Sequence, residues 1–436
     1  MQLSAQPLLD SPRDRRANQK SIRGKLRGAT VALLSCAAAG SAADFGTPWT
    51  ADGALLVYSE SGRVTVVEPV IQVKRDFSDG KFLTARYVFD TMTGASPVGA
   101  TATNRVQTFT TPSGNTTKVA PGETPLRDFH DQRSAGDVSY ATPVTRYLKT
   151  TIGGSASSET DYSSLGLRSS WSYDLDQRRS TLTAGVGFNS DHINPVGGKP
   201  LGLGRVGAHP TVETTESKQV ADFLIGTSRV LSRRWLMLLN YSYGSEHGYL
   251  TEPYKMISEV DGVTGETPAG SYRYEKRPDN RIRQSIFAQS IYHLARDVVR
   301  VSYRYYFDDW GIRSHTVDLK YSWNLGRGVI LQPHTRWYRQ SAADFYTYRL
   351  IRGDPLPDYA SADYRLGDMT TLTFGAKLGI PVMENVNLNI RTEYMRQSGD
   401  SHPDDAIGIQ KDYDLFPAID AMIISAGLSI GFTDLQ

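Results

Sequence analysis

Residues 315–324 read His-Thr-Val-Asp-Leu-Lys-Tyr-Ser-Trp-Asn, and their polarity alternates with a period of two. Four apolar side chains share one side of this stretch: Val317, Leu319, Tyr321 and Trp323. Five polar side chains share the other: Thr316, Asp318, Lys320, Ser322 and Asn324. Successive side chains of a β-strand point to opposite faces, so the stretch predicts a half-buried strand with one apolar and one strongly polar face.

The same alternation recurs from about residue 53 to the end of the chain. It predicts sixteen strands, at residues 53–59, 63–76, 81–92, 131–142, 146–157, 161–174, 179–190, 216–230, 234–246, 282–296, 298–308, 313–324, 328–342, 368–380, 385–397 and 417–433. No repeat of fixed length accompanies them, which argues against a solenoid or a propeller.

The connections between the predicted strands alternate in length. Short turns are expected at residues 78–80, 175–178, 231–233, 325–327 and 381–384. Long loops are expected at residues 93–130, 191–215, 247–281, 343–367 and 398–416. Short turns at one end and long loops at the other are typical of barrels that span a membrane. We therefore predict an all-β fold, a transmembrane antiparallel β-barrel of about sixteen strands with short periplasmic turns and long extracellular loops.

The composition excludes several other classes of protein. The chain has 436 residues, with 48 Lys and Arg against 46 Asp and Glu, so its net charge of +2 suggests no nucleic-acid partner. Beyond the N-terminal region no run of about 18 apolar residues occurs, which argues against membrane-spanning helices.

Four aromatic residues fall beside predicted short turns, where rings favour the lipid headgroup level: Trp171, Tyr173, Trp235 and Trp323.

The N-terminus has the order of a secretory signal. A basic segment at residues 11–27 is followed by an apolar stretch at 29–40 and by the small residues Ser41-Ala42-Ala43. We expect residues 1–43 to be a cleaved signal peptide and residues 44–436 to form one barrel domain. Cys36, the one cysteine, lies inside the apolar stretch, so the mature chain then has none. A lipoprotein cleavage site at Cys36 is the alternative.

The turn at residues 78–80 allows a check on strand register. If it is tight, Gln72 faces Arg86, Lys74 faces Thr84, and Glu68 faces Asp90. Polar then meets polar throughout the hairpin. The two carboxylates require a nearby cation, for which Arg86 is the local candidate.

Charged residues on the polar faces are expected to line the barrel interior. The predicted set is Glu68, Lys74, Arg86, Asp90, Arg300, Arg304, Asp318, Lys320, His334, Arg336, Lys377, Arg391 and Glu393. Within it, Arg304, Asp318 and His334 are predicted to line up across three adjacent strands, flanked by Lys320 and Arg336. Such a row either sets ion selectivity or holds the wall in shape through ion pairs. In the predicted set of lumen residues the cations outnumber the anions, which favours anionic solutes.

Other motifs suggest no definite chemistry. Gly202-Leu-Gly-Arg-Val-Gly207 matches a nucleotide-binding pattern, but no buried strand precedes it and His-Pro follows it, so a flexible loop is expected. Acidic residues cluster in the long loops, where divalent-cation binding and plain solvation both remain open: Asp354, Asp358, Asp363, Asp368, Asp400, Asp404 and Asp405. The eight His are scattered without zinc-ligand spacing. We expect no cofactor and no resident metal.

Two segments carry a family resemblance. Arg63 to Gly80 reads Arg-Val-Thr-Val-Val-Glu-Pro-Val-Ile-Gln-Val-Lys-Arg-Asp-Phe-Ser-Asp-Gly, and Asp90 to Pro97 reads Asp-Thr-Met-Thr-Gly-Ala-Ser-Pro. They resemble a bacterial outer-membrane family catalogued as domain of unknown function 3570. The resemblance implies a Gram-negative source and an outer-membrane barrel. It also implies genes beside a small lipoprotein, a flavin transferase and a thioredoxin-like protein, and hence a possible accessory role in flavin attachment or periplasmic redox chemistry.

Three functions remain open from the sequence. The first is a porin-like pore or solute channel with a charged lumen. The second is a closed barrel that anchors a periplasmic partner, such as a small lipoprotein. The third is an outer-membrane enzyme that uses Asp318 and His334 as a base, which we do not expect because no nucleophile lies beside them. In each case the chain is expected to contact outer-membrane lipid and lipopolysaccharide and to be inserted by the outer-membrane assembly machinery.

Overall fold

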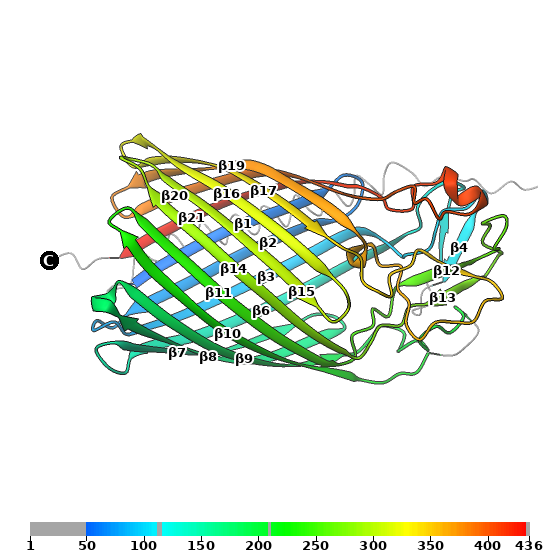
Figure 1. The fold of residues 1–436 in the computed structure, drawn as a ribbon, viewed down its shortest axis with the longest axis horizontal. Coiled ribbons are helices and arrows are strands. Elements are labelled where there is room, and N and C mark those ends of the chain that lie inside the picture. The colour runs from blue at the N-terminus through cyan, green and yellow to red at the C-terminus, as the bar shows by residue number, and fades with distance from the viewer. Residues whose placement is uncertain (1–48, 111–115, 208–210, 433–436) are drawn as a thin grey trace, which may run out of the picture.

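Sixteen antiparallel strands close into a barrel in the computed structural model, which describes residues 49–110, 116–207 and 211–432 (Figure 1). The barrel strands are β1 (Trp49–Glu60), β2 (Thr65–Asp76), β3 (Phe82–Pro97), β6 (Leu126–Pro143), β7 (Leu148–Ser158), β8 (Tyr162–Leu175), β9 (Ser180–Ile193), β10 (Glu216–Ser232), β11 (Trp235–Gly248), β14 (Asn280–His293), β15 (Val298–Asp308), β16 (Arg313–Gly326), β17 (Val329–Gln340), β19 (Met369–Met383), β20 (Val386–Gly399) and β21 (Ile419–Phe432). β1 pairs with β21, where Leu55 faces Ala426, and this pairing closes the ring.

The predicted fold class is confirmed, and each predicted strand is present with shifted ends. The largest shifts lie in β3, which runs on to Pro97, and in β6, which already begins at Leu126. These extensions pair with each other, and Gly94 faces Phe129. Where strands continue past the lipid layer, neither face has to be apolar, so the period-two signal fades there. The predicted signal peptide lies outside the described residues.

The apolar faces of the strands form the outer surface of the barrel. Leu319 is 45% exposed there, whereas the neighbouring Asp318 is only 8% exposed. Leu167 and Phe223 show the same high exposure on other strands. The four rim aromatics named above are also exposed and lie close to the short turns. An apolar belt of this extent is the surface that a lipid bilayer covers.

Replacing Leu319 by Arg is expected to destabilise the folded barrel by about 2–4 kcal/mol, because the guanidinium would face lipid near mid-strand. Urea titration of the protein in lipid vesicles measures this change. Leu319→Met, which keeps the outer face apolar, is the control. Equal stability of the two variants would contradict the assignment of this face to lipid.

The β2–β3 hairpin has the predicted register. Gln72 faces Arg86 and Lys74 faces Thr84, across a turn in which Ser78 and Asp79 have positive φ angles. The cation in direct contact with Asp90, however, is not the predicted Arg86. Arg133 on β6 faces Asp90, with Nη2 at 2.5 Å from its carboxylate, and Arg86 instead faces Asp137.

The connections at the long-loop end are of two kinds. Three of them are short, at residues 61–64, 159–161 and 309–312, and the others are long and more structured than the sequence predicts. The longer ones carry five short strands that lacked a detectable alternation: β4 (Gln107–Thr110), β5 (Thr116–Val119), β12 (Met256–Val260), β13 (Tyr272–Tyr274) and β18 (Arg349–Ile351). Strands β13, β12 and β18 form one sheet, and β4 and β5 form a hairpin. Within the described residues, no helix is long and apolar enough to cross a membrane.

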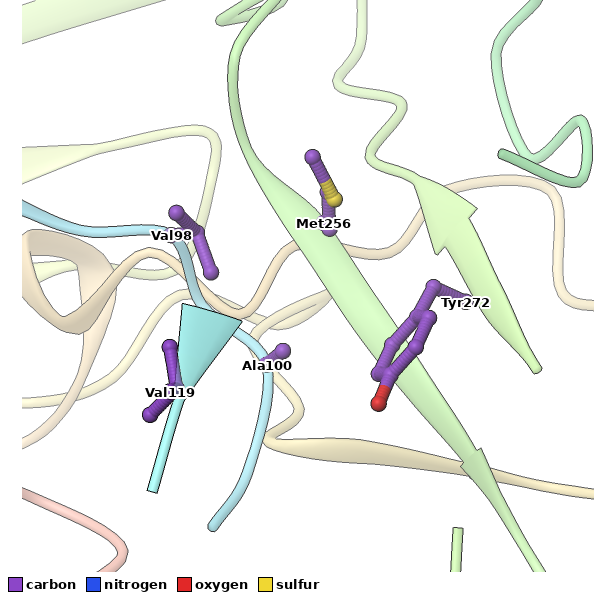
Figure 2. Close-up of a cluster of buried hydrophobic side chains, with 5 residues drawn as sticks. All are labelled: Val98, Ala100, Val119, Met256 and Tyr272. Carbon is purple, nitrogen blue, oxygen red and sulfur yellow. The ribbon is translucent and has the colours of Figure 1, made fainter. Parts of the chain in front are cut away.

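We call the described parts of residues 98–125, 194–215, 249–279, 341–368 and 400–418 the loop cap, which extends from one end of the barrel (Figure 1). It has its own apolar cores. One joins two loops far apart in sequence and is shown in Figure 2: Val98, Ala100, Val119, Met256 and Tyr272. A second includes Leu203 of the glycine-rich motif, packed with Ile257. That motif is therefore a loop, as predicted, but its Leu203 is anchored in a core.

Buried charges also stabilise the loop cap. Arg277 contacts Glu275 at 2.6 Å and Asp363 at 2.9 Å, and both carboxylates are inaccessible or nearly so. Burial opposes ionisation of Asp363, but the charges of Arg365, Lys255 and Arg277 outweigh it and hold the pKa of Asp363 below its ordinary value. Burial raises the pKa of Glu275 despite Arg277. Asp363 was predicted as one of the exposed acidic loop residues, and that exposure is wrong, because its carboxylate is buried among cations.

Candidate functional site: the charged inner wall

Strand pairing places the thirteen predicted lumen residues on one face of the sheet. Paired residues share a face, and so do residues two apart in a strand. Lys320 faces His334, and Lys377 faces Arg391. The complete set is Glu68, Lys74, Arg86, Asp90, Arg300, Arg304, Asp318, Lys320, His334, Arg336, Lys377, Arg391 and Glu393. The low exposure of Asp318, His334 and Glu393 identifies this face as the interior.

The centre of the wall is a histidine held between two carboxylates. The Nε2 atom of His334 lies 2.8 Å from Asp318, and its Nδ1 atom lies 2.8 Å from Glu393. Arg336 also bonds Asp318, from Nε at 3.0 Å, and Lys320 lies 3.4 Å from it. Two ionised carboxylates are acceptors only, so the imidazole satisfies both when each of its nitrogens carries a proton.

Gly375 makes the contact between His334 and Glu393 possible. It faces His334 on β17 and Glu393 on β20, so it lies between them on β19. A Cβ atom at this position would lie 2.2 Å from the carbonyl oxygen of Thr392. This link was not predicted from the sequence. A glycine at an inward position of a strand was the available signal, because it marks a close approach of other groups.

The predicted row of Arg304, Asp318 and His334 is only partly correct. Asp318 does contact His334, but Arg304 faces Thr316, and Ser302 faces Asp318. The β15–β16 turn lies at residues 309–312, between the predicted strand ends, but the pairing across it differs by two residues from the predicted one. Within this turn the buried ring of Trp310 packs among loop-cap residues, and its Nε1 donates to the carbonyl oxygen of Asn280 at 2.8 Å.

The carboxylates of this region are buried, whereas its cations are accessible. The side chains of Asp318 and Glu393 are 10% and 8% exposed, against 50% for Arg336 and 42% for Arg391. Like charges also face each other directly, in the pairs Arg300–Lys320 and Lys377–Arg391. Such pairs are destabilising in a sheet without a counter-charge. We call Arg300, Lys320, Arg336, Lys377 and Arg391 the cationic wall.

The opposite side of the lumen is more balanced. Arg133 pairs with Asp90, and Arg168 bonds Asp137 at 2.8 Å. Lys74 lies over the ring of Phe82, 4.0 Å from its centroid. Arg168 and Asp137 were not among the predicted lumen residues, although they alternate with apolar neighbours just as the predicted residues do. Charge in the lumen is therefore distributed unevenly, with excess positive charge on β15–β20.

One group of carboxylates has the spacing of a metal site. Ligand atoms of Asp131, Glu159 and Asp161 lie within 4.8 Å of one another near the long-loop end. Thr160 and Tyr254 donate hydrogen bonds to Asp131 and Asp161. Two of the predicted acidic loop residues are exposed, as expected for solvated groups, and also form surface ion pairs. Asp405 pairs with Arg349, and Asp368 with Arg339.

The fold and the inner wall define a class: a sixteen-stranded transmembrane β-barrel with a charged lumen. The chain belongs to the family described as "Protein of unknown function (DUF3570)", whose model matches residues 24–430. The resemblance seen in the sequence is thereby confirmed. No curated protein matches the chain.

Solved structures share the barrel arrangement at low sequence identity. The siderophore receptor PirA from Acinetobacter baumannii is 11% identical, with a TM-score of 0.40 over 81% of this chain and 53% of the receptor. A bacterial polysaccharide outer membrane secretin is 7% identical, with a TM-score of 0.45 over 89% and 100%. OccK2 (OpdF) from Pseudomonas aeruginosa, in complex with glucuronate, is 10% identical, with a TM-score of 0.39 over 89% and 98%. The chain spans 53–61% of the length of the siderophore receptors it matches. These likenesses concern the fold alone.

Proposed function

We propose that this protein is an outer-membrane pore for small anionic solutes. The observation that carries the proposal is the cationic wall, whose positive side chains are accessible while Asp318 and Glu393 beneath them are buried. Rings of charged side chains set the ion preference of a pore. Sixteen strands also enclose an interior of the size found in water-filled porins.

The proposal includes the route to the membrane. Residues 1–43 act as a cleaved secretory signal, and the assembly machinery then inserts the barrel. Its outer belt contacts lipid and lipopolysaccharide. The exposed apolar faces support this placement, because an apolar belt of this extent is the kind of surface that lipid covers. N-terminal sequencing of protein extracted from outer membranes tests it, and a protein that retains residues 1–43 would contradict it.

We expect the refolded protein to conduct ions in planar bilayers with a preference for chloride over potassium. Replacing Lys377 and Arg391 together by Gln removes two positive charges that face each other in the lumen. The preference for chloride, measured as the reversal potential in a KCl gradient, is expected to fall at least about two-fold.

Lys411→Gln is the matched control, because it removes a charge from the exposed surface of the loop cap and leaves the wall intact. Its reversal potential is expected to equal that of the wild type. Absence of conductance from correctly folded protein would overturn the pore, and an unchanged reversal potential in the double variant would overturn the role of the cationic wall.

A further inference from the structure

A separate cavity lies where the loop cap meets the inner wall. Its volume is about 420 Å³, and its lining comes from both parts of the molecule. The loop cap contributes Arg277, Asp363 and Arg365, among others, and the barrel wall contributes Arg281 and Arg304. Four guanidinium groups and one carboxylate line the cavity, and two further carboxylates outside the lining, Glu275 and Asp308, pair with Arg277 and Arg281. A volume of this size is typical of sites for small molecules.

Protein contacts hold three of these arginines in place. Arg277 and Arg365 both bond Asp363, so the carboxylate of the lining is already shared between two cations. Arg281 donates from Nε to Asp308 at 2.9 Å and lies over the ring of Trp310. Their guanidinium groups are thus oriented before any ligand arrives, which lowers the entropic cost of binding.

Arg304 differs from the other three. Within the described part of the chain its guanidinium has no carboxylate partner and no hydrogen bond, and its one described contact is the ring of Phe287 at 5.6 Å. It is exposed to the lumen and faces Thr316, whose side chain also lines the cavity. Arg304 therefore has five N–H donors without an acceptor, beside arginines that are already held by protein groups. Such an arginine is free to bind an anionic ligand.

Hydroxyl groups complete the lining. Tyr306, Tyr338, Ser314 and Thr316 lie on the same wall as Arg304. The hydroxyls of Tyr306 and Tyr338 donate to Asp308 and Gln340, so towards a ligand they act as acceptors, and the side chain of Thr316 has no hydrogen bond among the described residues. Guanidinium groups bind carboxylates and phosphates through paired hydrogen bonds, whereas hydroxyl groups match the hydroxyls of a ligand. We propose that this cavity binds a small hydroxylated solute that carries a phosphate or a carboxylate. This inference rests on the proposed pore, because it names the class of solute that the pore would select at its loop-cap end.

The test is isothermal titration calorimetry on the full mature protein in detergent, with three probes. A hexose phosphate and a sugar acid supply the two anionic groups on a hydroxylated frame, and the neutral hexose is the reference. We expect at least one anionic probe to bind at least ten-fold more tightly than the neutral hexose. Preference for the phosphate or for the sugar acid identifies the anionic group. Equal binding of all three probes, or binding of none, would overturn the site.

Two variants locate the binding within the cavity. Arg304→Gln is expected to weaken binding of the preferred probe about ten-fold, because it removes the cation without a protein partner. Thr316→Val keeps the shape but removes a hydroxyl, and a several-fold loss is expected. Arg313→Gln removes an equal charge from the opposite face at the same barrel end, and it should leave affinity unchanged. If Arg304→Gln and Thr316→Val, both folded as judged by circular dichroism, bind like the wild type, the cavity is not the site.

The outcomes for the pore and for the cavity remain distinguishable. Conductance with the predicted ion preference, but no binding of any probe, would remove the cavity site and keep the pore. Specific binding that Arg304→Gln weakens, without conductance, would remove the pore and keep a ligand site in the loop-cap end of the barrel.

Discussion

Replacing His334 by Leu is expected to destabilise the barrel by about 3–5 kcal/mol, because it leaves two buried carboxylates without their shared partner. Asp318 retains Arg336 and Lys320, but Glu393 loses its 2.8 Å contact and, among the ion pairs of the described residues, keeps Arg391 at 3.8 Å. Urea unfolding in lipid vesicles, followed by tryptophan fluorescence, measures the change in the free energy of unfolding.

A second variant separates the charge effect from the loss of packing. Combining His334→Leu with Asp318→Asn and Glu393→Gln removes the charges that the imidazole compensates. We expect this triple variant to recover at least half of the lost stability, since neutral amides cost less to bury than unpaired carboxylates. If the triple variant is no more stable than His334→Leu, the histidine acts through packing and the charge argument is wrong.

Gly375→Ala is expected to prevent formation of the native barrel or to reduce its yield severely. The added Cβ would lie 2.2 Å from the Thr392 carbonyl oxygen and 2.6 Å from the Glu393 Cα, and both are backbone atoms. Neither can move without separating β19 from β20. The fraction of heat-modifiable, folded protein after refolding into detergent measures the effect.

Gly379→Ala is the matched control for this substitution. Gly379 lies on the same face of the same strand, four residues further on, and its added Cβ would first meet Asn389 Oδ1 at 3.3 Å. A side-chain amide can move by a few tenths of an ångström, so we expect near-normal refolding. Equal yields of folded protein from the two variants would contradict this prediction, because β19 and β20 would then accommodate a Cβ atom at Gly375 without loss of stability.

The strands were predictable because a lipid layer outside and a polar interior impose opposite polarity on alternate residues. Leu319 and Asp318 are neighbours in the chain, so they lie on opposite faces, and Leu319 is exposed on the outer face whereas Asp318 is buried on the inner one. The register of the β2–β3 hairpin was predictable for a similar reason, since a tight turn fixes every pair that follows it. Gln72 and Arg86 face each other as a result.

Contacts between strands that are not sequential neighbours were not predictable in the same way. The partner of Asp90 is Arg133, which follows a long loop, so no turn length relates the two residues. The pairing across β15 and β16 was predicted two residues out of register, so Arg304 faces Thr316 rather than Asp318 and lines the cavity.

The amino-acid sequence by itself determined the barrel, its two faces and the residues whose charges point inwards, because these depend on local alternation and on short turns. Only the tertiary structure decided which charges meet. The link from His334 to Glu393 across Gly375, and the packing of distant loops such as those of Val98 and Met256, depend on closure of the ring and on long loops folding together. No local pattern encodes contacts of that kind, because their energy comes from groups that only the closed barrel brings together.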